Sequence, residues 1–267
     1  MKIPSKLPAF GLFLSMTLLS VTGCNEEFPD NAPVRVLAAE LGSIVDARFG
    51  GEGLNLDGAQ MAVAISKLLE VTNFSAAGTV RTTITLTSTG ANPGDVDATL
   101  LSAFDIFFIG YLNDNSPNAF TAAELTAFQD WVNIGGILIV TCDEANYDAV
   151  CEAFGYPSTT AATPPTVPAA TGIGHDSFAG SFGAVASIAM SGTSGFFATT
   201  TDAIILGEDS AVAPNATFLE KQVGLGTVIF LSDVDMISDN TLSAGTGFTN
   251  DNDRFLGNLF EYVTGLL

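Results

Sequence analysis

Cys142 is the residue whose type and place in this sequence could most readily support chemistry. It follows the apolar run ILIVT at 137–141 and precedes two acids, Asp143 and Glu144. A thiol where a buried strand passes into a helix can serve as a nucleophile, provided that a base lies within reach. The sequence has one histidine, His175. Cys142 and His175 are therefore the candidate catalytic pair.

Acidic and amide side chains follow three apolar runs of the sequence. Ligands of α/β proteins bind beyond the carboxyl ends of the strands, so these side chains are candidates for ligand binding. A hard cation such as Ca²⁺ would be one ligand for such oxygens. However, DVDMISDN at 233–240 lacks the glycine and the spacing of a calcium loop, and we assign no metal. The candidate ligand-binding residues are Asn113, Asp114, Asp143, Glu144, Asp233 and Asp235.

The elements that must position these residues follow from the apolar patterns. Runs that are apolar throughout predict strands buried on both faces, whereas the alternation in 79–87 predicts an edge strand. The stretch 155–174, with four prolines, reads as a long surface excursion. The glycine-rich stretch 49–55 carries neither a Walker lysine nor GxGxxG, so we predict no nucleotide cofactor. The buried strands are expected at 34–39, 105–111, 137–142 and 227–233, and further strands at 184–190, 202–208 and 216–224.

Helical spacing of apolar residues predicts the intervening helices. Thr121 and Glu124 have the spacing of a capping box, and Gly135 and Gly136 are a helix stop. Alternating strands and helices specify an α/β protein, a three-layer sandwich with a mostly parallel central sheet, formed by residues 34–267 as one domain. The helices are expected at 56–70, 121–136, 146–155 and 252–263.

Several stretches resemble the class I glutamine amidotransferase-like superfamily, and in particular its non-amidotransferase branch of bacterial envelope proteins. GHDSFAGSFG at 174–183 also resembles the HP…G.FG segment of those proteins, with Asp176 in place of the proline. The resemblance covers roughly residues 34–265 and implies a flavodoxin-like fold. The stretches that carry it are FDIFFIGY at 104–111, FTAAELTAFQDWVNIGGILIVTCDE at 120–144, VGLGTVIFLSDVDMISDN at 223–240 and DNDRFLGNLFEYV at 251–263.

The resemblance also argues against catalysis by Cys142. In the amidotransferases the cysteine stands in a Gly-x-Cys-x-Gly elbow, whereas Val140 and Glu144 occupy the glycine places here. The strained turn tolerates little side-chain bulk, and the adjacent carboxylates disfavour a thiolate. The family's histidine follows a later strand, which here ends in SDVDMIS at 232–238. We expect Cys142 to be a packing residue.

Cys151 shares the apolar face of the predicted helix 146–155 with Phe154. If that helix begins near residue 145, steps of about 1.5 Å per residue carry Cys151 about 10 Å from its start. A disulfide needs Cα atoms within about 7 Å of each other. We therefore expect Cys142 and Cys151 to be unbonded, although an oxidising compartment would allow the bond.

The N-terminal residues resemble a bacterial lipoprotein signal. Lys2 and Lys6 precede the apolar run 9–21, and VTGC at 21–24 has the form of a lipobox. The resemblance implies removal of residues 1–23, acylation of Cys24 and a tether over 24–33. Asn25 follows the cysteine, and in lipoproteins sorted by this position a residue other than aspartate favours the outer membrane.

The charge balance limits the partners of the mature chain. Loss of the first 23 residues would remove two lysines and no acid, which changes the formal net charge from −21 to −23. Only 14% of the residues are charged and the mean hydropathy is +0.40, which is typical of a folded domain and not of an acidic tail. Such a surface repels phosphate backbones, so nucleic acid is not an expected partner.

Three classes of function are compatible with these observations. We favour an envelope lipoprotein, anchored in the membrane by its acyl chains, whose amidotransferase-like domain is a non-catalytic binding or scaffolding module without a cofactor. Its partner would be an envelope protein, a glycan or a small ligand. The alternatives are a hydrolase or amidotransferase-like enzyme that uses Cys142 and His175 or a metal, and a structural surface protein without a discrete ligand.

Overall fold

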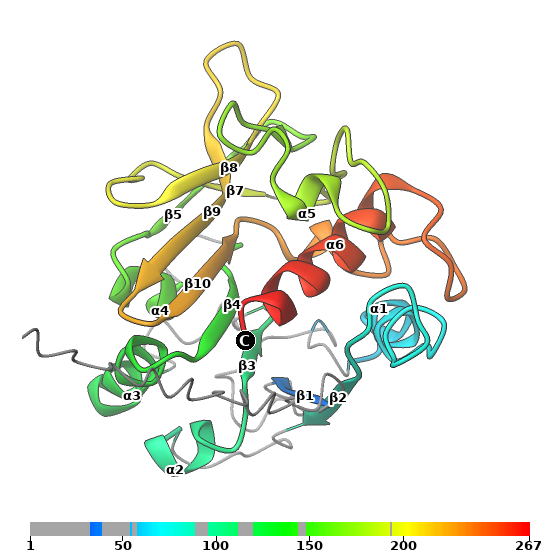
Figure 1. Cartoon of the computed structure of the whole chain (residues 1–267). Coiled ribbons are helices and arrows are strands. Elements are labelled where there is room, and N and C mark those ends of the chain that lie inside the picture. The colour runs from blue at the N-terminus through cyan, green and yellow to red at the C-terminus, as the bar shows by residue number, and fades with distance from the viewer. Residues whose placement is uncertain are drawn as a thin grey trace, which may run out of the picture.

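A central β-sheet with helices on both of its faces forms the protein (Figure 1). The structure, a computed structural model, describes residues 33–38, 54, 58–88, 96–111, 120–143, 148–192 and 194–267. The predicted signal peptide and nearly all of the tether, including Cys24 and Asn25, lie outside the described residues.

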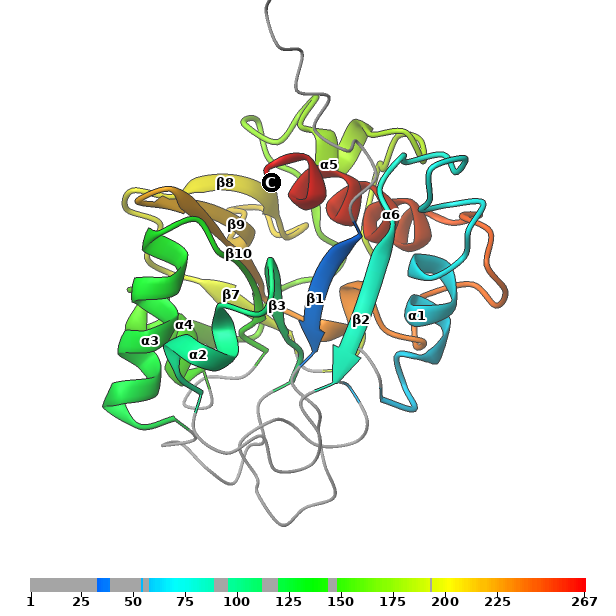
Figure 2. The same ribbon diagram turned by 60° about the horizontal axis from the view of Figure 1, so that its bottom comes forward.

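One half of the sheet is parallel, in the order β2-β1-β3-β4-β10. Its strands are β1 (Val34–Ala38), β2 (Ile84–Ser88), β3 (Ile106–Ile109), β4 (Ile137–Thr141) and β10 (Gly226–Leu231). Figure 2 shows β1, β2 and β3 side by side. The four predicted buried strands are thus confirmed as parallel, and the predicted edge strand 79–87 corresponds to β2 at the end of the sheet.

The other half of the sheet is antiparallel and continues from β10. It consists of β9 (Ala216–Val223), β8 (Ile204–Glu208), β7 (Gly195–Phe197), β5 (Ser158–Thr160) and β6 (Val167–Pro168). The predicted excursion 155–174 therefore contributes two short strands of its own.

The strand predicted at 184–190 is wrong. This stretch makes only an isolated bridge, between Thr166 and Ile188. The backbone N–H groups of residues 186 and 187 donate to Asp251, and that of residue 189 donates to Asn252. Side chains at the start of the last helix thus take the hydrogen bonds that a strand ladder would have used.

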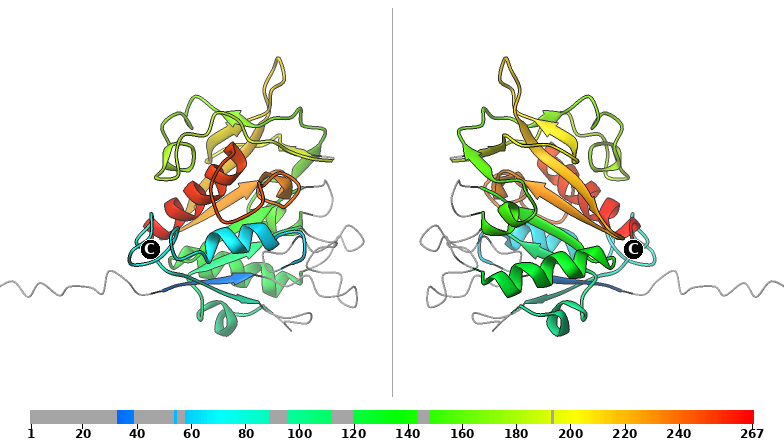
Figure 3. Two further views of the ribbon diagram at one scale, coloured as in Figure 1. Left: turned by 90° about the vertical axis from the view of Figure 1, so that its right-hand side faces the viewer. Right: turned by 90° about the vertical axis from the view of Figure 1, so that its left-hand side faces the viewer.

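Six helices flank the two faces in the described residues (Figure 3). On one face lie α1 (Ala62–Leu68), α5 (Asp176–Ala179) and α6 (Asp251–Gly265), whose apolar residues form one core cluster. On the other face α2 (Ala98–Leu101), α3 (Ala122–Asn133) and α4 (Ala149–Ala153) form a second cluster. None of these helices has both the length and the apolarity that crossing a membrane requires. The molecule is the expected three-layer α/β sandwich.

The ends of α3 follow the predicted signals. The Thr121 hydroxyl accepts a hydrogen bond from the Glu124 N–H, and the Glu124 carboxylate accepts one from the Thr121 N–H, which completes the capping box. The helix stops before Gly135, whose φ of +121° favours glycine. A Cβ at Gly136 would lie 2.3 Å from the Trp131 ring, so only glycine lets β4 start this close to α3.

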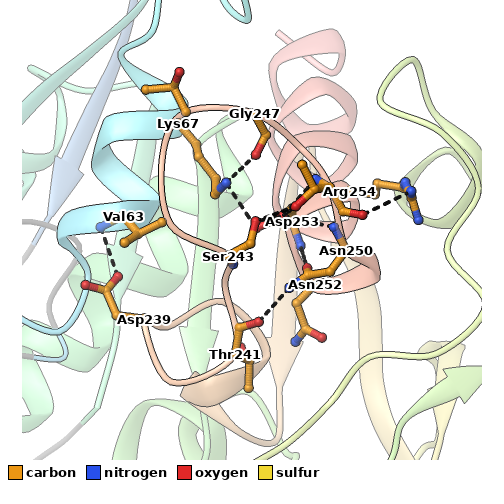
Figure 4. A network of polar contacts seen from close by, with 12 residues as sticks. Val63, Lys67, Asp239, Thr241, Ser243, Gly247, Asn250, Asn252, Asp253 and Arg254 are labelled. Carbon is orange, nitrogen blue, oxygen red and sulfur yellow. Dashed lines mark hydrogen bonds and ion pairs between the residues drawn. The ribbon is translucent and has the colours of Figure 1, made fainter.

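A buried ion pair joins α1 to α6 (Figure 4). Lys67 Nζ lies 3.1 Å from Asp253 Oδ1, and both side chains are fully buried. The ammonium also donates to the Gly247 carbonyl and lies 5.5 Å from the centroid of the Phe248 ring. A charged pair without access to water persists only when further hydrogen bonds compensate each ion.

Asp253 receives that compensation from the start of α6 and the loop before it. The N–H groups of Ser243, Thr249 and Asn250 donate to its carboxylate at 2.8–3.0 Å. Burial by itself raises the pKa of Asp253, but the hydrogen bonds of Ser243, Asn250, Thr249 and Lys67 outweigh it and hold the pKa below its ordinary value. The carboxylate therefore stays charged opposite Lys67.

We predict that Lys67→Met lowers the free energy of unfolding by about 3–5 kcal/mol, because Asp253 would keep a buried charge without its cation. Urea unfolding followed by circular dichroism measures this. The control is Arg35→Gln, which breaks the Arg35–Asp105 pair, where the arginine side chain is 50% exposed. That change should cost at most about 1 kcal/mol. Equal effects of the two substitutions would contradict the prediction.

Candidate functional site

The carboxyl edge of the parallel strands is the place where the sequence predicts a site. Cys142 and Asp143 follow β4, and Asp233 and Asp235 follow β10. Three other candidates, Asn113, Asp114 and Glu144, lie outside the described residues. Of the candidate ligand-binding residues, the structure therefore describes those that follow β4 and β10.

Cys142 is bonded to Cys151, which corrects the expectation that the two are unbonded. Their Cα atoms are 6.3 Å apart, within disulfide range. The expected distance between the two cysteines was too long because it assumed a helix start near residue 145, whereas α4 begins at Ala149. Cys151 is thus in the first turn of the helix and not seven helical steps along it. Both cysteines are fully buried, and in this state neither carries a thiol.

His175 does not meet Cys142. It is the N-cap of α5, where its Nδ1 accepts from the Ser177 N–H at 3.2 Å. Its Nε2 lies 3.4 Å from Glu220 Oε2, and its ring contacts the Tyr262 ring edge-on at 4.4 Å between centroids. Tyr262 belongs to α6, whereas Cys142 belongs to the core cluster beneath α3 and α4. The sheet stands between the two members of the candidate catalytic pair.

Tyr262 closes the polar contacts around His175. Its hydroxyl donates to Glu220 Oε2 at 2.8 Å. Burial, the hydrogen bond to Glu220 and the negative charges of Glu220 and Asp176 all raise the pKa of the Tyr262 hydroxyl. The hydroxyl therefore stays protonated and keeps donating, so this cluster joins α5, β9 and α6 as a structural contact.

Asp233 is fully buried, and donors of its own chain occupy its carboxylate. Oδ2 accepts from the Ser194 hydroxyl at 2.8 Å and the Ser191 N–H at 3.3 Å. Oδ1 accepts from the Asp235 N–H at 2.6 Å, which caps the 3₁₀ turn η1 (Val234–Met236). Burial raises the pKa of Asp233 to about 7, and the charge of Asp235 adds to this rise against the opposing hydrogen bonds.

Asp235 is also held by its own loop. Oδ1 accepts from Asn240 Nδ2 at 2.9 Å and from the Ser238 hydroxyl. Asp233 and Asp235 therefore fold the segments around β10 and do not project into solvent. Among the described residues, no group of three or more histidine, cysteine or acidic side chains has a geometry suited to a metal ion.

Two hydroxyls that the sequence does not single out lie near the ends of β4 and β10. The Oγ atoms of Ser158 and Ser232 are buried, and neither has a hydrogen-bond partner in the structure as described. Gly195 lies against both residues, because its N–H donates to the Ser232 carbonyl and a Cβ on it would lie only 2.8 Å from Ser158 Oγ. The carbonyl of Asp143, a half-buried residue, would lie 3.1 Å from that Cβ.

We call these residues, Asp143, Ser158, Gly195 and Ser232, the carboxyl-edge cluster. Buried hydroxyls without partners are uncommon and point to a water molecule or a polar ligand group that would complete their bonds. The cluster contributes hydroxyl and carbonyl groups but no thiol and no histidine. Its chemistry suits hydrogen bonding to a bound group better than bond cleavage. No short motif marks it, since Ser158, Gly195 and Ser232 come from three distant segments.

Comparisons with known proteins identify the fold. No protein-family model matches the chain, and no curated protein matches it in sequence. A putative ThuA-like protein from Bacteroides uniformis is 15% identical with a TM-score of 0.51, over 87% of this chain and 92% of that one. The mmIFT52 N-terminal domain is 14% identical with a TM-score of 0.50, over 68% of this chain and 85% of that one.

The exo-β-1,4-mannosidase Op5Man5 from Opitutaceae bacterium strain TAV5 is 14% identical with a TM-score of 0.46, over 79% of this chain and 32% of that one. At these identities the likeness concerns the fold alone. Together with the sheet order, the ThuA-like neighbour shows that the chain has the glutamine amidotransferase-like, flavodoxin-like fold.

We predict that iodoacetamide does not label Cys142 or Cys151 in urea until a reductant is added. The Cys142→Ser/Cys151→Ser variant should lose about 2–3 kcal/mol of unfolding free energy, as expected for a bond between residues nine positions apart. Mass spectrometry of the labelled peptides and urea unfolding measure the two quantities. Labelling of either residue before reduction would contradict the disulfide.

We predict that Asp233→Asn changes the pH dependence of stability. Between its ordinary pKa of 3.8 and about 7, Asp233 keeps a proton in the folded state that the unfolded chain has released. Its contribution to stability is therefore complete below about 4 and is lost as the pH rises through about 7. The variant should gain stability relative to the wild type over this range, measured by urea unfolding at several pH values.

The control for this measurement is Asp251→Asn. The pKa of Asp251 is lowered, because the hydrogen bonds from residues 186 and 187 and from Arg254 outweigh the effect of burial. Asp251 therefore loses its stabilising contribution only at pH values below its ordinary pKa of 3.8. The stability difference between this variant and the wild type should stay flat from about pH 4 to 7. A flat difference for Asp233→Asn as well would refute the assignment.

Proposed function

We propose that this protein is a lipid-anchored protein of the bacterial cell envelope, in the outer membrane, whose amidotransferase-like domain is a non-catalytic binding or scaffolding module. The observation that carries the proposal is the disulfide between Cys142 and Cys151. It engages the sulfur of Cys142, the cysteine that follows a central parallel strand, where the resemblance to the amidotransferases would require a nucleophile.

The disulfide supports both parts of the proposal. Disulfides persist in oxidising compartments such as the periplasm and the cell surface, which agrees with the lipoprotein signal in the sequence. A cysteine held in a buried disulfide provides no thiolate for attack on an amide. The sheet between Cys142 and His175 removes the base as well.

The carboxyl-edge cluster supports binding as the function. Ser158 and Ser232 carry buried hydroxyls without a hydrogen-bond partner in the structure as described, and a side chain on Gly195 would collide with Ser158 Oγ. A ligand that donates and accepts hydrogen bonds would complete them, as a glycan hydroxyl, a peptide group or a small polar molecule does. The acidity of the chain disfavours nucleic acid among such ligands.

We predict that Cys24 carries the lipid. Metabolic labelling with an alkyne fatty acid should label the wild type and be lost in Cys24→Ala, as measured by gel fluorescence after coupling to a dye. The Cys142→Ser/Cys151→Ser variant is the control, because it removes the other two cysteines and should keep the label. Unchanged labelling of Cys24→Ala would reject the lipid anchor.

Absence of catalysis has its own test, which concerns the enzymatic alternative. The purified full chain, incubated with glutamine, should release no ammonia above the buffer rate, with or without reductant. Release that is lost in His175→Ala would overturn the non-catalytic proposal.

A further inference from the structure

Exposed apolar side chains gather at the amino edge of the parallel sheet, opposite the carboxyl-edge cluster. Several elements end there. Helix α3 stops just before β4, the turn between β9 and β10 precedes β10, and α6 reaches the C-terminal residues. The exposed apolar side chains on these elements are Ile134 (72% exposed), Leu225 (80%), Leu266 (43%) and Leu267 (56%).

Contacts place Ile134, Leu225 and Leu267 on one surface, whereas Leu266 lines a different hollow with Asp176 and Glu261. The Leu225 N–H donates to the Asn133 carbonyl at 3.0 Å, which places Leu225 beside the end of α3. Ile134 and Leu267 line the same hollow of about 300 Å³, together with Trp131. A second hollow of about 290 Å³ also includes Ile134 and Trp131 and extends between α2 and α3. We call this surface the amino-edge patch.

The charged side chains in the first hollow neutralise each other. Arg35 and Asp105 both line it, and their side chains pair at 2.9 Å. The amino-edge patch therefore combines exposed leucine and isoleucine with one internal ion pair and, in the second hollow, Asp130, in an acidic chain. Exposed apolar side chains that cluster in this way mark a surface that meets a partner or a membrane.

The path of the chain indicates whether the amino-edge patch meets a partner or a membrane. Strand β1 begins at Val34 at this same edge, and Figure 3 shows its start on the side of the molecule where the C-terminus lies. Only the nine residues 25–33 separate Val34 from Cys24. At about 3.5 Å per residue, a lipid on Cys24 cannot lie more than roughly 35 Å from the start of β1.

We propose that the amino-edge patch rests on the surface of the lipid bilayer, so that the carboxyl-edge cluster lies on the side away from the membrane. This proposal rests on the lipid anchor proposed above. Apolar side chains at an interface enter the boundary between headgroups and acyl chains, and they add to the affinity that the acyl chains provide. The acidity of the chain favours zwitterionic over anionic headgroups.

The test uses the full lipidated chain in phosphatidylcholine vesicles. Ile134→Cys and Leu225→Cys are each labelled with a polarity-sensitive dye, and the vesicles contain lipids with a nitroxide quencher in the headgroup region. Val212→Cys is the control, because Val212 is also an exposed apolar residue but lies in the loop between β8 and β9. The native disulfide and the lipid on Cys24 leave no other thiol to label.

Quenching of the dyes at 134 and 225, with none at 212, is the expected result. Equal quenching at all three positions, or none at 134 and 225 in protein that floats with the vesicles, would overturn the proposal. Protein that does not float with vesicles at all would reject the lipid anchor instead. A dimer in sedimentation that protects 134 and 225 without lipid would show that a second copy covers the patch, which also overturns the proposal.

Discussion

The buried pair of Lys67 and Asp253 is the constraint on which the arrangement of this face of the protein depends. It joins α1 to the first turn of α6, and the capping box of Asn250 and Asp253 fixes where that helix begins. The same turn presents Asp251 and Asn252 to the backbone of residues 186–189. From there the chain leads to Ser191 and Ser194, which hold Asp233, and then to Gly195 of the carboxyl-edge cluster. A charge pair buried on one face therefore positions backbone at the carboxyl edge.

The disulfide constrains the other face of the same edge. It joins the residue after β4 to the first turn of α4, where an active amidotransferase would need a free thiol on a tight turn. Both cysteines lie in the apolar cluster with Phe230 and Tyr156, so the bond is shielded from reductants as well as from substrates. Such a position suits a structural bond.

Most of the fold could be predicted from the sequence, because the parallel strands are apolar on both faces and α3 carries its own capping signals. The failures came where tertiary contacts override local preference. The segment 184–190 has a strand-like pattern, but α6 takes its hydrogen bonds. Helix α4 starts late, and Asp148, the residue before it, accepts from the Ser158 N–H on another element. Because α4 starts late, Cys151 lies in its first turn and within bonding distance of Cys142. The carboxyl-edge cluster could not be predicted, since its residues meet only after folding.

The sandwich architecture limits where this protein can meet other molecules. Helices cover both faces of the parallel strands, so those strands reach the surface mainly at their two ends. The two ends differ in chemistry: the amino edge exposes leucine and isoleucine, whereas the carboxyl edge holds hydroxyls, carbonyls and buried carboxylates. A chain that enters at the amino edge places any anchor on the apolar side. The polar edge then lies on the side away from that anchor, at the ends of the strands where parallel sheets form their binding sites.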